Sequence, residues 1–300
     1  MEDDAEARRA RAGWLLALAG SVAFSGKAII VKLAYRHGVD PVTLIMYRML
    51  FALPLFALLA WWAARGREAL SARDRAAVAA LGFSGYYLAS FLDFAGLQYI
   101  SASLERLILY LNPTLVLLLG LLLHRARVAA RQWGAMALSY AGIVLVFGHE
   151  ARLEGSNVAL GAALVFASAV SYASYLVGSG QVVRRIGSMR LTGLATLVAC
   201  VLCIAQFALL RPLSAAAVAP EVLWLSALNA TLCTFVPVVA VMMAIERIGA
   251  AATAQAGMVG PVATVLMAMV LLGESLTVWT VAGTVLVLAG VAWLARARSA

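Results

Sequence analysis

Long apolar runs separated by short polar connectors make up nearly the whole chain. Each run is continuous over about 20 residues, the length that an α-helix needs to cross a bilayer, and none alternates like a barrel strand. The pattern predicts an all-α integral membrane protein with ten transmembrane helices. Their expected bounds are 13–35, 41–64, 76–98, 101–124, 131–148, 157–179, 189–211, 221–245, 250–272 and 278–295.

The apolar segments occur as two similar sets. A shift of 148 residues carries 95–146 onto 243–294 without a gap, and it places Pro113 on Pro261 and Gly142 on Gly290. We expect a first repeat at 13–148 and a second at 157–295, within a single membrane domain over 1–300. Five spans separate the copies, and because five is odd the second copy should be inverted. Inverted repeats are typical of transporters that work by alternating access.

Composition and charge support a membrane protein and orient it. Of 300 residues, 64% are hydrophobic and 12% charged, whereas a soluble domain has about 25% charged residues. Sixteen Lys and Arg residues fall in segments on the side of the N-terminus, and three fall in connectors on the other side. The positive-inside rule then places both termini in the cytoplasm, at a bacterial inner membrane. The net charge of +9 follows from this bias, so we expect no nucleic-acid partner.

Signals for cofactors and catalysis are missing. Cys200, Cys203 and Cys233 all lie in expected spans, where they indicate neither a disulfide framework nor a metal site. The sequence contains no phosphate-binding loop and no hydrolase or metalloprotease motif. We therefore expect no cofactor, no metal and no enzyme activity. The expected partners are a small-molecule substrate and the lipid bilayer, and the oligomeric state stays open.

One pattern of the second half resembles a known family. Gly260-Pro261 is followed by Glu274, Gly283 and Gly290, a spacing similar to that of the EamA half-domain of the drug/metabolite transporter superfamily. The resemblance covers nearly the whole chain. It implies two inverted five-helix units and export, often of amino acids, and the most similar subgroup is that of YddG-type aromatic amino acid exporters. Ala126 stands where the first half should match Glu274.

Five charged residues lie about 6–12 Å below the outer ends of the expected spans, all in the outer half of the first repeat. An ionised group at mid-bilayer costs about 2.5–3.5 kcal/mol on insertion scales, so each should face a partner or a cavity. The matching positions of the second half are neutral. The charges form either a substrate site with an outer gate or a structural salt-bridge network. We assign Lys27 and Asp93 to substrate binding, and to gating or coupling Arg48, Glu105 and Arg106.

Aromatic and hydroxyl side chains form a second candidate set. A tyrosine offers apolar area and a hydroxyl, which suits an amphipathic ligand; the alternative is ordinary helix packing. The expected cavity residues, with Lys27 and Asp93, are Phe24, Ser25, Tyr86, Tyr87, Ser90, Tyr110, Ser171, Tyr172, Tyr175, Asn229, Thr234, Gln255 and Met258. Pro113 and Pro261 should kink spans four and nine, either for gating or as static bends.

These features together predict a secondary transporter. It would export small amphipathic metabolites, most of all aromatic or hydrophobic amino acids, by alternating access through a central cavity between the two repeats. Efflux of hydrophobic cations or other drug-like solutes is the alternative within transport. An intramembrane enzyme or a lipid scaffold is the alternative from another class. Facilitated diffusion and proton coupling both remain open.

Overall fold

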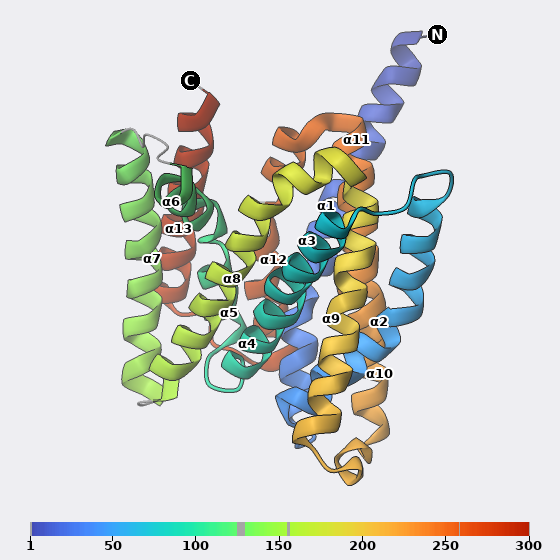
Figure 1. Cartoon of the computed structure of the whole chain (residues 1–300). Coiled ribbons are helices and arrows are strands. Elements are labelled where there is room, and N and C mark those ends of the chain that lie inside the picture. The colour runs from blue at the N-terminus through green and yellow to red at the C-terminus, as the bar shows by residue number, and fades with distance from the viewer. Residues whose placement is uncertain (1, 125–129, 155–156, 258, 300) are drawn as a thin grey trace.

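The computed structural model describes residues 2–124, 130–154, 157–257 and 259–299, and every regular element among them is helical. Figure 1 shows the two termini at the same end of the helical bundle. The elements are α1 (Glu2–Tyr35), α2 (Pro41–Ala64), α3 (Ala72–Gly82), the π-helix η1 (Phe83–Leu88), α4 (Ala89–Gly96), α5 (Ala102–Leu109), α6 (Asn112–His124), α7 (Ala130–Glu154), α8 (Asn157–Ile186), α9 (Ser188–Leu210), the 3₁₀-helix η2 (Leu213–Ala216), α10 (Pro220–Ala230), the π-helix η3 (Thr231–Phe235), α11 (Val236–Gly257), α12 (Val259–Met267), the π-helix η4 (Ala268–Leu272) and α13 (Val278–Ser299).

Eight helical segments of the described chain are long and apolar enough to cross a membrane. They are Ala10–Tyr35, Pro41–Ala64, Ala72–Gly96, Ala102–Leu122, Ala130–Ala151, Asn157–Ile186, Ser188–Leu210 and Pro220–Val241. Two shorter apolar segments, Val259–Leu272 and Val278–Trp293, lie where the ninth and tenth spans are expected. The chain is thus a multi-pass membrane protein, as the apolar runs indicate.

Helix α11 differs from the sequence-based expectation. The polar residues at 246–249 predict a connector, but α11 continues from Val236 to Gly257. Glu and Arg are good helix formers, so a polar pair here does not end a helix. The Arg247 guanidinium also donates to the carbonyl of Met243, one turn back, at 2.9 Å. The stretch at 246–249 is therefore not a helix end.

Side-chain caps fix the starts of the three helices α2, α3 and α5. Asp40 accepts hydrogen bonds from the backbone N–H groups of Val42 and Thr43 at the start of α2. Ser71 caps α3, and Ser101 caps α5 through the N–H of Leu104. Short polar side chains at these positions satisfy N–H groups that have no partner within the helix.

Irregular helix segments recur at equivalent positions of the two halves. The π-helix η1 begins at Phe83 and η3 begins at Thr231, which is 148 residues later. The span that holds α5 and α6 is also broken, at Tyr110-Leu111. A π-helix widens the helix locally, a geometry that is frequent at functional sites.

The two prolines lie near the starts of α6 and α12. Pro113 is the second residue of α6, and Tyr110 and Leu111 before it form a turn, so span four is interrupted before Pro113 and not merely kinked at it. Pro261 is the third residue of α12. Because it has no N–H, it leaves the carbonyl of Gly257, four residues earlier, without a helix partner, and the kink expected there stays a prediction.

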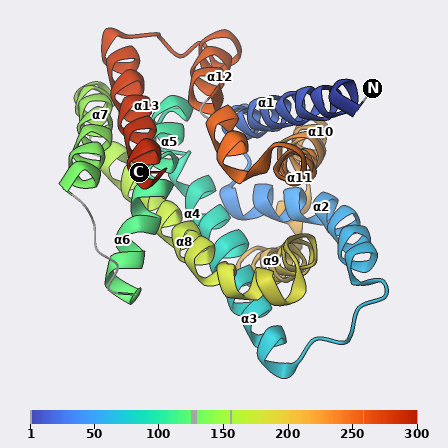
Figure 2. The same cartoon turned by 90° about the horizontal axis from the view of Figure 1, so that it is seen from above.

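The helices pack into two groups that each mix the halves of the chain. The first bundle consists of α1 with α10, α11 and α12, and the second of α8 with α3, η1, α4, α5 and α6. Helix α2 packs on α9, and α7 packs on α13 (Figure 2). The first helix of each bundle thus comes from one half and its partners from the other.

Glycines mark the close approaches inside the two bundles. A Cβ on Gly13 would lie 2.6 Å from a methyl of Ile248, and one on Gly161 would lie 2.7 Å from the matching methyl of Ile100. Gly161 follows Gly13 by 148 residues, and Ile248 follows Ile100 by the same number. The two bundles therefore share one packing scheme, and only glycine fits at these crossings.

Candidate functional site

A buried ion-pair cluster joins the two bundles. The Nζ atom of Lys27, on α1, lies 2.5 Å from Oδ2 of Asp93 and 3.0 Å from Oε1 of Glu105. Asp93 belongs to α4 and Glu105 to α5, so both carboxylates come from the second bundle. Lys27 is 6% exposed, Asp93 3% and Glu105 0%. At this burial, ion pairs need direct partners, since water cannot solvate the charges.

Two arginines complete the cluster and contact neutral groups of the other half. Nε of Arg48 donates to Oγ1 of Thr234 at 3.1 Å, and its guanidinium lies over the ring of Phe94. In the same way, Nε of Arg106 donates to Oγ1 of Thr264 at 2.9 Å. All the charges thus come from the first half of the chain, while hydroxyl partners come from the second.

Phe24 is the aromatic centre of this region. Its ring centroid is 5.7 Å from Nζ of Lys27 and 5.1 Å from the guanidinium carbon of Arg106. Such cation–π contacts stabilise a cation in a site that offers few oxygen ligands. Asn229 contacts the backbone of the same helix, because its amide donates to the carbonyl of Lys27 at 3.3 Å. The expected residues Phe24, Lys27, Asp93 and Asn229 are therefore brought together.

Several polar atoms of the cluster are buried without a hydrogen-bond partner among the described residues. They are Nη1 of Arg48, Nη2 of Arg106, Oδ1 of Asp93, Oε2 of Glu105 and Oδ1 of Asn229. Oε1 of Glu105 meets Lys27 as an ion pair without hydrogen-bond geometry. Leaving buried polar groups unpaired costs free energy. The cluster therefore has spare donors and spare acceptors for a ligand.

A tyrosine cluster occupies the equivalent place in the second bundle. The hydroxyls of Tyr86 and Tyr175 are 3.3 Å apart, and the ring of Tyr172 stacks on that of Tyr175. These three residues correspond, through the 148-residue shift, to Thr234, Lys27 and Phe24. Of these three positions, that of Lys27 is charged in one bundle and aromatic in the other, and that of Phe24 is aromatic in both. Gly85 leaves room for the tyrosines, since a Cβ there would overlap the ring of Tyr175.

Polar contacts also join the break in span four to the segment before Pro261. The hydroxyl of Tyr110, at the break, donates to the carbonyl of Gly257. Ser21 donates to the same carbonyl at 3.0 Å, and Ser25 donates to that of Gly260 at 2.8 Å. Side chains thus satisfy the carbonyl of Gly257, which Pro261 leaves without a backbone donor. This seam lies between the first bundle and α5.

The remaining expected residues are placed less centrally. Ser171 donates to the carbonyl of Ser84 and serves helix packing. Tyr87 packs against Phe83, and Ser90 is half-buried; in the described chain no hydrogen bond joins either to the clusters. The side chain of Gln255 and all of Met258 lie outside the described residues.

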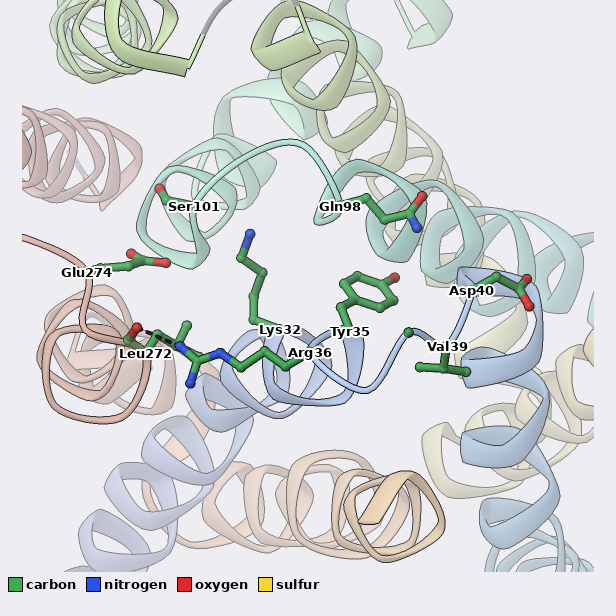
Figure 3. Close-up of a pocket in the computed structure, with 10 residues that line it drawn as sticks. Lys32, Tyr35, Arg36, Val39, Asp40, Gln98, Ser101, Leu272 and Glu274 are labelled. Carbon is green, nitrogen blue, oxygen red and sulfur yellow. Dashed lines mark hydrogen bonds between the residues drawn. The ribbon is translucent and has the colours of Figure 1, made fainter. Parts of the chain in front are cut away.

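A cavity of about 610 Å³ opens at the end of the bundle opposite the termini. Figure 3 shows Lys32 and Glu274 directed toward a common space. Its lining comes from α1, the α1–α2 and α4–α5 connections and the loop before α13: Lys32, Tyr35, Arg36, Gly38, Val39, Asp40, Gln98, Ser101, Leu272 and Glu274. Four of these ten side chains carry a charge, so the cavity is strongly polar.

Glu274 links the two halves at the rim of this cavity. Its carboxylate accepts hydrogen bonds from the N–H of Ala102 at 2.8 Å and from the hydroxyl of Ser103 at 2.7 Å. It thereby caps α5, where the helix dipole favours a negative charge. Arg36 donates to the carbonyl of Leu272, two residues before, at 2.7 Å. The family-like pattern pointed to Glu274, but nothing in the sequence indicated that it caps α5.

The ion-pair cluster lies directly inward of the cavity. Ser101 lines the cavity and Glu105 belongs to the cluster, one helical turn and about 6 Å apart on α5. On α1, Lys32 lies about 8 Å from Lys27 along the axis, although the five-residue spacing places it on a different face of the helix. Sequence reasoning missed Lys32 as a lining residue, and its spacing from Lys27 gave no signal, because residues that share a helix face are three or four apart.

Ion pairs between the halves occur at both ends of the bundle. At the cavity end, Nε of Arg211 lies 3.1 Å from Oδ1 of Asp40. Partial burial acts to raise the pKa of Asp40, but hydrogen bonds from Thr43 and Arg211 outweigh it and lower the pKa below its ordinary value. At the end of the termini, Arg185 pairs with Asp74 at 2.7 Å. This second contact borders a polar cavity of about 400 Å³.

Metal ligands do not cluster: no group of three His, Cys, Asp or Glu side chains within the described residues could hold a metal ion. Cys200, Cys203 and Cys233 are buried, and each is a free thiol. The chemistry available in the cluster is therefore that of ion pairing and hydrogen bonding.

One family profile and several known proteins match this chain. The profile of the EamA-like transporter family matches residues 11–148 and 159–296. The uncharacterised transporter YcbK of Bacillus subtilis is 31% identical over 288 residues, which cover 94% of this chain and 92% of that protein. An uncharacterised transporter of Archaeoglobus fulgidus is 27% identical over 174 residues, 57% of this chain and 58% of that one. One solved crystal structure shares the fold, with a TM-score of 0.63 and 18% identity over 96% of this chain and 99% of its own.

Proposed function

The chain belongs to the EamA-like transporter family, and from this premise we propose that it exports small amphipathic metabolites, above all aromatic or hydrophobic amino acids. The observation that carries the proposal is the buried cluster of Lys27, Asp93 and Glu105 between the two bundles. Spare donors on the arginines suit a substrate carboxylate, and spare carboxylate oxygens suit an ammonium group. Phe24 and the tyrosine cluster offer aromatic surface nearby.

We also propose the topology. Ten transmembrane helices form two inverted five-helix repeats, 13–148 and 157–295, with both termini in the cytoplasm of a bacterial cell. The recurrence of π-helices and glycine crossings after 148 residues supports the repeat. The large cavity then opens to the outside, and it leads toward the cluster.

Transport would proceed by rocking of the first bundle against the second. Lys27 moves with the first bundle, while its two carboxylate partners move with the second. A substrate that competes for these ion pairs loosens the contact between the bundles, and so couples binding to movement. In this scheme Arg48, Glu105 and Arg106 govern gating, and the break before Pro113 and a kink at Pro261 allow α6 and α12 to move.

Uptake into proteoliposomes tests the proposal. Liposomes that contain the purified protein are given a panel of labelled amino acids, with and without a pH gradient, and protein-free liposomes serve as the control. We expect saturable uptake of at least one aromatic or hydrophobic amino acid. Inhibition by lipophilic cations but not by amino acids would contradict the proposal and favour cation efflux. A pH gradient that changes the steady-state level, and not merely the rate, would indicate proton coupling.

A further inference from the structure

We propose that the cluster selects substrates of net charge −1, so that a carboxylate whose amine is blocked binds better than the corresponding zwitterion. The inference rests on the proposed function and narrows its substrate class. It starts from a count of charges: Lys27, Arg48 and Arg106 face only Asp93 and Glu105 among the described residues. With every group ionised, the cluster carries one positive charge in excess.

The three cations lie close together. Lys27 and Arg106 both contact the ring of Phe24, at 5.7 Å and 5.1 Å from its centroid. The guanidinium of Arg48 lies over Phe94, the residue next to Asp93 in α4, and Arg106 is next to Glu105 in α5. The excess charge is therefore a property of one site and not a sum over distant groups.

A purely structural network would not be built in this way. Burying an uncompensated charge is costly, so a network that only locks helices should contain equal numbers of cations and carboxylates. Helices of the second half contribute hydroxyls to the arginines, through Thr234 and Thr264, but no carboxylate from their described residues. A substrate anion would supply the charge that the scaffold lacks.

The spare hydrogen bonds agree with an anion. Lys27 is occupied by two carboxylates, whereas Arg48 and Arg106 each keep one buried terminal nitrogen without a partner among the described residues. Guanidinium groups bind carboxylates through charge-assisted hydrogen bonds. The cavity end lies only about one to one and a half helical turns away along α1 and α5, and it offers Lys32 on the path.

Three derivatives of one amino acid test the charge preference at constant side chain. N-acetylphenylalanine carries −1, phenylalanine is a zwitterion and phenylalanine methyl ester carries +1. Each is titrated onto the purified protein in micelles while tryptophan fluorescence reports binding, and each competes against labelled phenylalanine in proteoliposomes. We expect N-acetylphenylalanine to bind most tightly and the ester most weakly. Each step should be about tenfold, the scale of one charge-assisted hydrogen bond.

Neutralising one arginine should abolish the preference. Arg106→Gln makes the cluster neutral, and we expect N-acetylphenylalanine to lose about tenfold in affinity relative to phenylalanine. Arg48→Gln provides the same change if Arg106→Gln does not fold. Arg190→Gln is the matched control, because Arg190 is also buried but hydrogen-bonds the carbonyl of Glu68 at the other end of the bundle. It should leave the order of the three compounds unchanged.

The outcomes separate the two levels of the account. Equal or tighter binding of phenylalanine than of N-acetylphenylalanine overturns the charge preference while the transporter proposal stands. Tight binding of N-acetylphenylalanine with no uptake of any amino acid supports the preference and contradicts amino acids as substrates. If none of the three compounds binds, the charge preference and the amino acid substrate class both fail.

Discussion

Replacing Lys27 by methionine should strongly destabilise the protein. The substitution keeps an unbranched side chain of similar length but removes the cation that contacts Asp93 at 2.5 Å and Glu105 at 3.0 Å. Glu105 is 0% exposed, so water cannot replace the lost partner. Removing one member of a buried ion pair costs about 3–5 kcal/mol. That cost corresponds to a change of about two to four powers of ten in the unfolding equilibrium.

Denaturant-induced unfolding in detergent micelles, followed by tryptophan fluorescence, measures this loss. Lys32→Met is the matched control, because Lys32 hydrogen-bonds the carbonyls of Leu97 and Ile100 at the edge of the cavity and leaves no carboxylate unpaired. We expect it to cost less than half as much as Lys27→Met. Adding Glu105→Gln to Lys27→Met should restore part of the stability, because one of the unpaired buried charges disappears.

Two results would refute this reasoning. If Lys27→Met unfolds at the same denaturant concentration as the wild type, the ion pairs do not hold the bundles together. If Glu105→Gln adds a further loss to Lys27→Met instead of a recovery, the cost arises from packing and not from unpaired charge.

Three other variants probe separate features. Gly85→Ala should cost about 1–3 kcal/mol in unfolding free energy, because the new Cβ would overlap the ring of Tyr175. Asp40 has a lowered pKa in the folded state, so its stabilising contribution is complete above about pH 4 and is lost as the pH falls through the folded-state value; Asp40→Asn should remove this part of the acid-induced loss in a pH series. Joint replacement of Pro113 and Pro261 by alanine should slow uptake more than it weakens binding, since the added N–H groups can donate to carbonyls one turn back and so stiffen the two spans.

Each of these variants has a control or a contrary outcome. Gly180→Ala is the control for Gly85→Ala, because a Cβ on Gly180 meets nothing within 4 Å; equal losses in both would point to a general effect of glycine replacement. If Asp40→Asn loses as much stability at low pH as the wild type, the pair with Arg211 does not contribute to the acid-induced loss. Unchanged turnover in the double proline variant would rule out Pro113 and Pro261 as hinge residues.

The apolar pattern predicted the helical membrane fold well, because a span in lipid is specified by its own composition. It could not predict how the spans pair. The first helix of each half packs in a bundle with helices of the other half, and this arrangement depends on crossings such as that of Gly13 with Ile248. Nor could it predict the π-helices η1 and η3, since these depend on packing against α8, α9 and α1.

The candidate site was partly predictable for a physical reason. Charges inside apolar spans are expensive, so Lys27, Asp93 and Glu105 stood out, and their matching depths indicated pairing, which the structure contains. Hydroxyl and aromatic residues carry no such cost, and for them sequence alone separates packing from binding poorly. Ser171 thus belongs to a helix contact. The cap that Glu274 makes on α5 depends on a loop meeting a helix 171 residues away in sequence.

The most direct test of the account compares uptake by wild-type protein with uptake by Asp93→Asn and Glu105→Gln in proteoliposomes at equal protein content. Asp74→Asn is the matched control, since Asp74 also forms an ion pair, in its case with Arg185, but lies outside the cluster. If the cluster is the transport site, both cluster variants lose most of the uptake while Asp74→Asn keeps it. Wild-type uptake by both cluster variants would show that the buried charges only hold the helices together.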